Sequence, residues 1–350
     1  MIDTPLQHSR IAVARCLFVL TAAMAAVPAV AHTWCVSTAG DLRAKLVLAQ
    51  ANGEDDTIKL VHGTYLVDTD PFKFQSNETF GLVINGGFDV GCTQTDKDPH
   101  RTILDGNGTH QVLYSSSKGN LALRYLTIQN GRFDGGAGGG IQINGTGPDS
   151  SVVLGINILR NNSSTFASCV GYINVEGTVH VNNNLIVGNH TPAAGGLSIN
   201  AGASALAYVT NNTIANNTTG NAIAGFISIE HFNSAMPFAY LSNNIMWNNV
   251  AGSDVQFSGG GIQFNNNDIA NIDGFPSDGS GANLGVDPGF VSNSDYHLAA
   301  SSPLLGIGLF APDGGLPMGD LDGHARDFNG MVDFGAYERG DAIFSDGFEP

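Results

Sequence analysis

The chain has few basic residues. Its 350 residues include 14 lysines and arginines against 31 aspartates and glutamates, and no lysine or arginine lies between positions 161 and 325. The formal net charge of −17 at pH 7 repels the phosphates of nucleic acids and the headgroups of anionic membranes. We therefore expect neither nucleic acid nor an anionic membrane as a partner.

Long apolar runs are also missing. No stretch of the chain is both long and apolar enough to cross a bilayer as a helix, so we expect no transmembrane segment. The first 31 residues have the features of a secretory signal: Arg10 and Arg15, then an apolar stretch at 16–27, then the small-residue site Ala29-Val-Ala31. We expect cleavage there and an exported protein, either secreted or on the cell surface.

Cysteine is scarce as well. Three cysteines follow the expected cleavage site, namely Cys35, Cys92 and Cys169, and none is spaced with histidine as in a zinc site. An oxidising compartment favours one disulfide, and we expect Cys35–Cys92 because both residues lie in the amino-terminal third of the chain. Cys169 is expected to be a buried free thiol, so its disulfide state stays open.

What the chain has in abundance is asparagine in a repeated unit. The unit Asn-(Ile/Leu/Thr)-(Ile/Leu/Met)-x-x-Asn occurs four times, with starts 27, 28 and 32 residues apart. The four copies are 157–162, 184–189, 212–217 and 244–249. Repeats with a period of this length are typical of stacked coils rather than of a compact core.

Each copy follows a segment in which every second residue is apolar, and a second alternating segment lies between copies. Short strands in coils of 23–32 residues, with glycine and asparagine at the corners, are typical of a parallel β-helix. Asparagine suits these corners because it tolerates the left-handed conformation and can pair with buried backbone groups. We therefore predict that the repeated asparagines have a structural role and are not part of a catalytic or binding site.

The organisation that follows has five parts. We predict a signal peptide at 1–31, an amino-terminal cap at 32–51, a parallel β-helix at 52–300, a closing segment at 301–340 and a tail at 341–350. The cap is expected to contain a short amphipathic helix, because Leu42, Leu46 and Ala49 follow Asp41 at helical spacing. Such a helix would cover the open end of the solenoid.

Several motifs resemble known families. The segments 86–92 (GGFDVGC), 104–106 (LDG) and 126–131 (LTIQNG), with the NNxIxxN corners, resemble right-handed parallel β-helix proteins of the pectin-lyase-like superfamily. The segments 286–290, 295–303 and 320–338 resemble the choice-of-anchor Q domain of exported bacterial proteins. The resemblance implies an all-β, right-handed parallel β-helix solenoid. It implies no single activity, because the superfamily holds lyases, hydrolases and adhesins.

Two kinds of catalysis can be compared with the residues present. Pectate lyases of this superfamily use a basic residue and calcium, and the candidates for such a base here are Lys118, Arg124, Arg132 and Arg160, near the first coils. An anionic substrate also matches so acidic a chain poorly. The lyase hypothesis is therefore the weaker one.

A hydrolase needs paired carboxyl groups. Aligning the coils on the asparagine unit places Glu176 and Glu230 in one outward column, two rungs or ~10 Å apart. That is close to the ~6.5–9.5 Å between the carboxyl groups of inverting glycosidases. The two glutamates are candidate acid and base; the alternative is that both are solvated on an exposed face.

A second outward column contains aromatic rings. The alignment stacks His180, Tyr208 and Tyr240 one rung apart, where they could contact sugar rings while an amide such as Asn200 binds hydroxyl groups. The alternative is a structural role, because neighbouring aromatic side chains stabilise a sheet by about 0.2–1 kcal/mol per pair.

The acidic carboxy-terminal segment offers a candidate cation site. Asp320, Asp322 and Asp327 could supply oxygen ligands to calcium, although a solvated acidic segment is the alternative. Our leading hypothesis is a monomeric exported protein that binds an extended neutral glycan, such as a polysaccharide or cell-envelope glycan, along one face. The alternatives are a polysaccharide-degrading enzyme and a structural or adhesive spacer.

Overall fold

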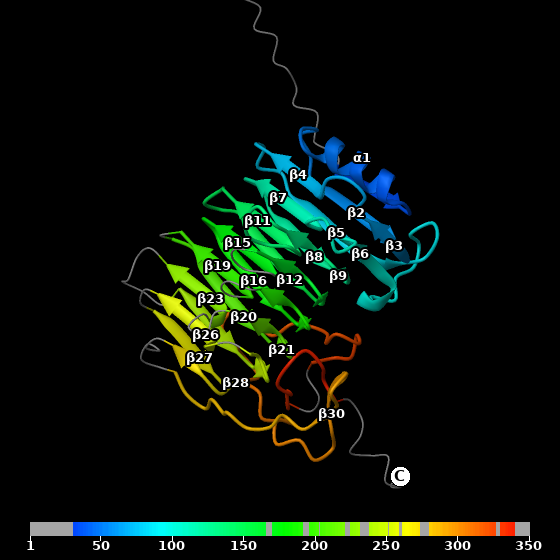
Figure 1. The fold of residues 1–350 in the computed structure, drawn as a ribbon. Coiled ribbons are helices and arrows are strands. Elements are labelled where there is room, and N and C mark those ends of the chain that lie inside the picture. Colours follow the sequence, from blue (N-terminus) through cyan, green and yellow to red (C-terminus); the bar gives the residue numbers. More distant parts are fainter. Residues whose placement is uncertain are drawn as a thin grey trace, which may run out of the picture.

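The computed structural model describes residues 31–339 except for 166–169, 192–195, 203, 221–224, 232–237, 251, 259–260, 274–279 and 327–329. The expected signal sequence up to residue 30, Cys169, Asp327 and the tail lie outside the described residues. Within them the chain winds into an all-β parallel β-helix of about seven turns, which confirms the predicted fold class (Figure 1).

Three long parallel sheets form the walls of the solenoid, each with one strand per coil. Sheet A has nine strands: β1 (His32–Val36), β2 (Asp56–Val61), β5 (Leu82–Phe88), β8 (Leu121–Arg124), β12 (Ser151–Gly155), β16 (Thr178–Asn182), β20 (Leu206–Thr210), β24 (Ala239–Ser242) and β27 (Ile262–Asn265). Sheet B has eight: β3 (Gly63–Leu66), β6 (Thr102–Asp105), β9 (Thr127–Gln129), β13 (Ile158–Arg160), β17 (Leu185–Val187), β21 (Thr213–Ala215), β25 (Ile245–Trp247) and β28 (Asp268–Ile269).

Sheet C also has eight strands: β4 (Phe72–Ser76), β7 (Leu113–Ser117), β11 (Ile141–Gly145), β15 (Gly171–Val175), β19 (Leu197–Ala201), β23 (Gly225–His231), β26 (Ser253–Ser258) and β29 (Ile272–Asp273). A short fourth sheet, D, consists of β10 (Arg132–Phe133), β14 (Ser163–Ser164), β18 (His190–Thr191) and β22 (Thr218–Thr219). A 3₁₀ turn, η1 (Pro99–Arg101), precedes β6, and an antiparallel pair, β30 (Phe290–Ser292) and β31 (Asp295–Leu298), follows the coils.

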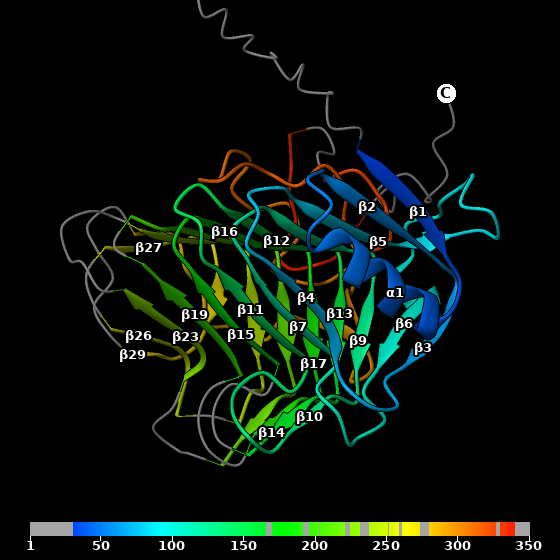
Figure 2. The ribbon, with the colours of Figure 1, turned by 90° about the horizontal axis from the view of Figure 1, so that it is seen from above.

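The core consists of inward columns of apolar side chains. One column of sheet A is at most 1% exposed from β2 to β27: Ile58, Ile84, Leu123, Leu154, Val181, Val209, Leu241 and Phe264. Burying each such side chain stabilises the fold by about 1.5–3 kcal/mol. At the amino-terminal end lies the helix α1 (Ala39–Ala49), capped by the Thr38 hydroxyl (Figure 2). Its Leu42 and Leu46 side chains join this core. The predicted helix therefore does cover that end.

The asparagine unit forms two ladders inside the corners. Asn184 accepts hydrogen bonds at Oδ1 from the backbone N–H and the side-chain amide of Asn157, and its own amide donates to the Leu154 carbonyl at 2.8 Å. The first ladder continues through Asn212, Asn244, Asn267 and Asn283, and the second contains Asn162, Asn189, Asn217 and Asn249. The ladders satisfy backbone groups that would otherwise be buried without partners.

The residue before each first-ladder asparagine has a left-handed backbone and turns its side chain outward. Four of these outer corner asparagines donate to carbonyls of the carboxy-terminal segment, defined here as residues 284–339: Asn183 to Gly319, Asn211 to Asp333, Asn243 to Leu309 and Asn266 to Ile307. The segment therefore runs back along the side of the coils (orange to red in Figure 1). The last pairing between coils is a bridge between Asp268 and Leu284. It lies before residue 300, where we predicted the β-helix to end.

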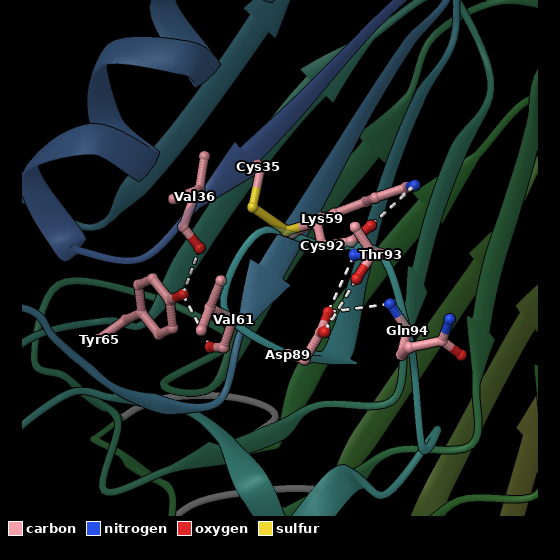
Figure 3. The surroundings of a disulfide bond; sticks show 9 residues. All are labelled: Cys35, Val36, Lys59, Val61, Tyr65, Asp89, Cys92, Thr93 and Gln94. Atoms are coloured by element: carbon pink, nitrogen blue, oxygen red, sulfur yellow. Dashed lines mark hydrogen bonds between the residues drawn. A yellow bond between two sulfur atoms is a disulfide. The ribbon is translucent and has the colours of Figure 1, made fainter.

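A disulfide ties the first strand to the next coil. Cys35 on β1 is bonded to Cys92, the expected pair, in the loop after β5 (Figure 3). Asp89 shapes that loop by accepting backbone N–H bonds from Thr93 and Gln94, which lower the pKa of its carboxyl group. Nearby, the Tyr65 hydroxyl is 2.7 Å from the Val36 carbonyl and holds the far end of β1.

Candidate binding groove on the outer face of sheet A

The structure does not place Glu176 and Glu230 in one column. Residue 230 is paired with Asn200, Asn200 with Asn174, and Asn174 with Asn144, whereas Glu176 lies beyond the end of β15, next to Gly202. The predicted column was therefore wrong by two residues on β15, where Asn174 takes the place predicted for Glu176. The proposed acid–base pair of Glu176 and Glu230 loses its geometric basis.

The error arose because Gly171 occupies an inward position. The alignment placed Ile173 opposite Ile141 and Leu197, but Gly171 is the residue opposite both. A Cβ on Gly171 would lie 2.6 Å from Ile141 Cγ1, so its neighbours fill the space that a side chain would take. A shift of two residues keeps every side chain on the same face, and the apolar alternation cannot reveal it.

The aromatic column, by contrast, is present. His180, Tyr208 and Tyr240 are paired one rung apart, with ring centroids 5.0 and 5.4 Å apart and interplanar angles of 22° and 15°. The faces that these rings turn toward one another are thus occupied by the neighbouring ring. Burial of His180 in this stack lowers the pKa of its imidazole. A sugar needs a free ring face for stacking, so this geometry favours the stabilising role.

The carboxy-terminal segment also covers part of the ladder. Gly314 approaches Tyr208 so closely that an added Cβ would lie 2.5 Å from Cγ and Cδ1 of the ring. Tyr240 has a raised pKa, chiefly through burial and then through the charge of Asp313. Tyr208 and Tyr240 are therefore contacts between the coils and their own carboxy-terminal segment.

Sheet A does carry an open groove toward its amino-terminal end. Two hollows of about 480 and 380 Å³ adjoin there, because Arg124 and Val153 line both. The floor consists of Val83, Ala122 and Val153, which are paired side by side on β5, β8 and β12. Pro317, Met318 and Gly319 of the carboxy-terminal segment form one rim of the larger hollow. We call this surface the sheet A groove.

The polar lining of the groove is mixed in charge. Lys97 and Arg124 supply two cations, and Asp55, Asp56 and Asp320 supply three carboxyl groups. Among the described residues Arg124 has no ion pair and no side-chain hydrogen bond, although it is half-buried. Uncharged donors and acceptors are also present: Thr57, Asn120, Ser151 and Asn182.

The candidate calcium ligands have other partners. Asp320 is fully buried and accepts backbone N–H bonds from Asp322, His324 and Glu338, so its two oxygens organise a turn. Asp322 accepts a hydrogen bond from His297 Nε2 at 2.6 Å. Ligand atoms of Asp320, Asp322 and His324 do lie within 4.8 Å of one another, but the carboxylate at the centre is already used.

Two side chains of the carboxy-terminal segment were not singled out from the sequence. Arg326 is 1% exposed and bonds to Asn183 and to Glu338. His297 lies between Asp295 and Asp322, and its ring contacts Tyr337 at a tilt of 33°. Burial opposes the charge of His297, but the two carboxylates prevail and raise its pKa. Both His297 and Arg326 lie among acidic residues in the segments 295–303 and 320–338, on which the family resemblance is based. This position in the sequence is the signal that could have identified them.

No protein-family model, curated protein or solved structure matches this chain. Among the described residues no helix has the length and apolar character needed to span a membrane. The functional argument therefore rests on the fold and on the geometry of the groove.

Proposed function

We propose that this chain is an exported or cell-surface β-helix protein that binds an extended neutral glycan in the sheet A groove. The observation that carries the proposal is the joining of the two hollows at Arg124 and Val153. Together they reach from Thr57 on β2 to Asn182 on β16, five adjacent strands or about 19 Å of sheet. A chain-like ligand fits such a trough better than a small compact one.

The lining supports a sugar ligand. Glycans present apolar C–H faces and a rim of hydroxyl groups, and the groove offers an aliphatic floor with amides and hydroxyls beside it. Binding sites of this kind are apolar surfaces with a small number of polar groups that fix orientation. The three carboxyl groups offset the two cations, so an uncharged glycan is favoured over an anionic one.

The resemblance to pectin-lyase-like and choice-of-anchor Q proteins, together with the expected signal sequence, supports export. The groove supports binding more than hydrolysis, because the glutamates that suggested hydrolysis do not share a column. The third hypothesis, a spacer without a ligand, is an outcome of the following test.

The test compares two phenylalanine substitutions on the purified protein. Val153→Phe fills the floor of the groove, and Asn174→Phe places the same ring outward on sheet C, where it serves as the matched control. On a panel of immobilised neutral polysaccharides we expect at least ~10-fold weaker retention for Val153→Phe and wild-type retention for Asn174→Phe. Retention that survives Val153→Phe, or the absence of any retained polysaccharide, would overturn the proposal. Tyr208→Leu should leave retention unchanged.

A further inference from the structure

Three potential metal ligands meet where the first strand joins the coils. The register of β1 and β2 places His32 directly beside Asp56, and Glu54 lies in the turn just before β2. One ligand atom from each of these three residues lies within 4.8 Å of the other two. His32 Nδ1 contacts Glu54 Oε2 directly.

The buried member of the group is Asp56. Its side chain is only 2% exposed, and its two oxygens accept hydrogen bonds from a single donor, the Asn52 amide, at 3.1 and 3.0 Å. The other amide atom, Asn52 Oδ1, is buried without a hydrogen-bond partner. The cluster therefore concentrates acceptors that a cation would satisfy.

The histidine is held in place from its own strand. Its ring stacks on Trp34 at 5.5 Å with an interplanar angle of 8°. One residue further along β1, Cys35 is fixed by the disulfide, and the Tyr65 hydroxyl holds the carbonyl of Val36 (Figure 3). Ligands preorganised in this way lose little conformational freedom when they bind.

We infer that His32, Glu54 and Asp56 form a binding site for a divalent transition-metal ion such as Zn²⁺. One imidazole and two carboxylates are ligands that Zn²⁺ accepts, whereas the nitrogen donor makes a calcium site less suitable. Cleavage at the expected site after Ala31 would also free the α-amino group of His32, a further nitrogen donor on the same residue. Since Asp56 lines the smaller hollow, the ion would lie at the amino-terminal end of the sheet A groove.

The simplest competing interpretation is an ion pair between a protonated His32 and the two carboxylates. The second group of potential ligands, Asp320, Asp322 and His324, is a further competitor for the same metal. Backbone N–H groups already occupy both oxygens of Asp320, so we expect no metal there. A test must separate these possibilities by residue.

The experiment is calorimetric titration of the chelator-treated protein with Zn²⁺, repeated with Co²⁺ to follow its visible absorption. The variants are His32→Ala and Glu54→Gln; the controls are Asp70→Asn, an exposed carboxylate elsewhere, and His324→Ala. We expect one equivalent of Zn²⁺ in the wild type and both controls, and at least ~10-fold weaker binding in the two site variants.

Thermal unfolding without metal shows whether each variant is folded, and added Zn²⁺ should raise the melting temperature only where His32 and Glu54 are intact. No binding by the wild type would overturn the inference, and so would binding that disappears in His324→Ala but persists in His32→Ala. Because no glycan enters the assay, failure of the glycan proposal leaves its result unaffected.

Discussion

Arg326 donates from Nε and Nη2 to the single oxygen Asn183 Oδ1, at 3.0 and 2.7 Å, and so joins two residues 143 positions apart. The same guanidinium contacts Glu338 at 3.3 Å and the Gly335 carbonyl at 2.7 Å. Asn183 is an outer corner of the coils, and Glu338 lies near the end of the carboxy-terminal segment. One buried cation therefore fastens that segment to the solenoid.

Replacing Arg326 by methionine should release the carboxy-terminal segment. The substitution keeps an apolar stem but leaves Glu338 and Asn183 without their donor in a buried site. Removing one partner of a buried ion pair costs about 3–5 kcal/mol, and we expect a loss of that order in urea unfolding together with faster proteolysis within 284–339.

The control is Arg132→Met, which removes the exposed ion pair with Asp134 and should change stability by less than about 1 kcal/mol. Equal effects of the two substitutions would show that Arg326 does not fasten the segment.

The internal ladder should be sensitive to loss of a single amide. Asn212 accepts from the backbone N–H and amide of Asn184 and donates to the Val181 carbonyl, all in buried surroundings. Asn212→Ala leaves these groups without partners, at about 1–3 kcal/mol for each buried group. We expect a loss of at least ~3 kcal/mol, measured by denaturant unfolding. Asn174→Ala, an outward asparagine on sheet C, is the matched control and should cost under ~1 kcal/mol; a similar loss in both would contradict a structural ladder.

The coil architecture could be predicted from the sequence because its causes are local. The spacing of Asn184, Asn212 and Asn244 gives the period, and the chemistry of asparagine gives the corner. The outward column of Val153, His180, Tyr208 and Tyr240 was confirmed, because the apolar residues on either side fix its register.

The failure at Glu176 has a different origin. Because side chains alternate between the two faces of a strand, the apolar pattern cannot distinguish strand registers that differ by two residues. Gly171 has no side chain, so the sequence did not show that it is the first inward residue of β15. The docking of the carboxy-terminal segment was hidden too, because contacts such as Asn211 with Asp333 link residues 122 positions apart. Besides its place in an acidic motif, Arg326 had a second visible signal: it is the first basic residue after the long interval without any.

Docking of the carboxy-terminal segment should also depend on pH through Glu338. Burial raises the pKa of this carboxyl group to about 7, Asp333 adds to the rise, and Arg326 opposes it. The unfolded value is about 4.3, so the folded state holds the proton more tightly. The stabilisation is then complete below about pH 4 and is lost as the pH rises through about 7.

We therefore expect the wild type to lose about 2 kcal/mol of stability between pH 5 and pH 8 from this group. Glu338→Gln cannot ionise and should flatten that part of the profile in urea unfolding at several pH values. Glu230→Gln removes an exposed glutamate and should keep the wild-type slope. The titration of His297, whose raised pKa acts in the same direction, remains in both variants, so only the difference between their slopes is diagnostic. Identical slopes would exclude Glu338 as the cause.

Two neighbouring glycines allow the contact between the carboxy-terminal segment and the aromatic ladder to be isolated. Gly314 and Gly315 have nearly the same backbone angle, with φ of +85° and +86°, so alanine is strained equally at both. Only at Gly314 would the new methyl group meet the Tyr208 ring; at Gly315 it would find open space. We expect Gly315→Ala to cost about 1 kcal/mol and Gly314→Ala a further 1–3 kcal/mol from overpacking. Combining Gly314→Ala with Tyr208→Ala, which removes the two nearest ring atoms Cγ and Cδ1, should remove most of that excess in a double-mutant cycle. If the two alanine variants are equally stable, Gly314 does not contact Tyr208 in solution, and the ring would then be free to meet a ligand.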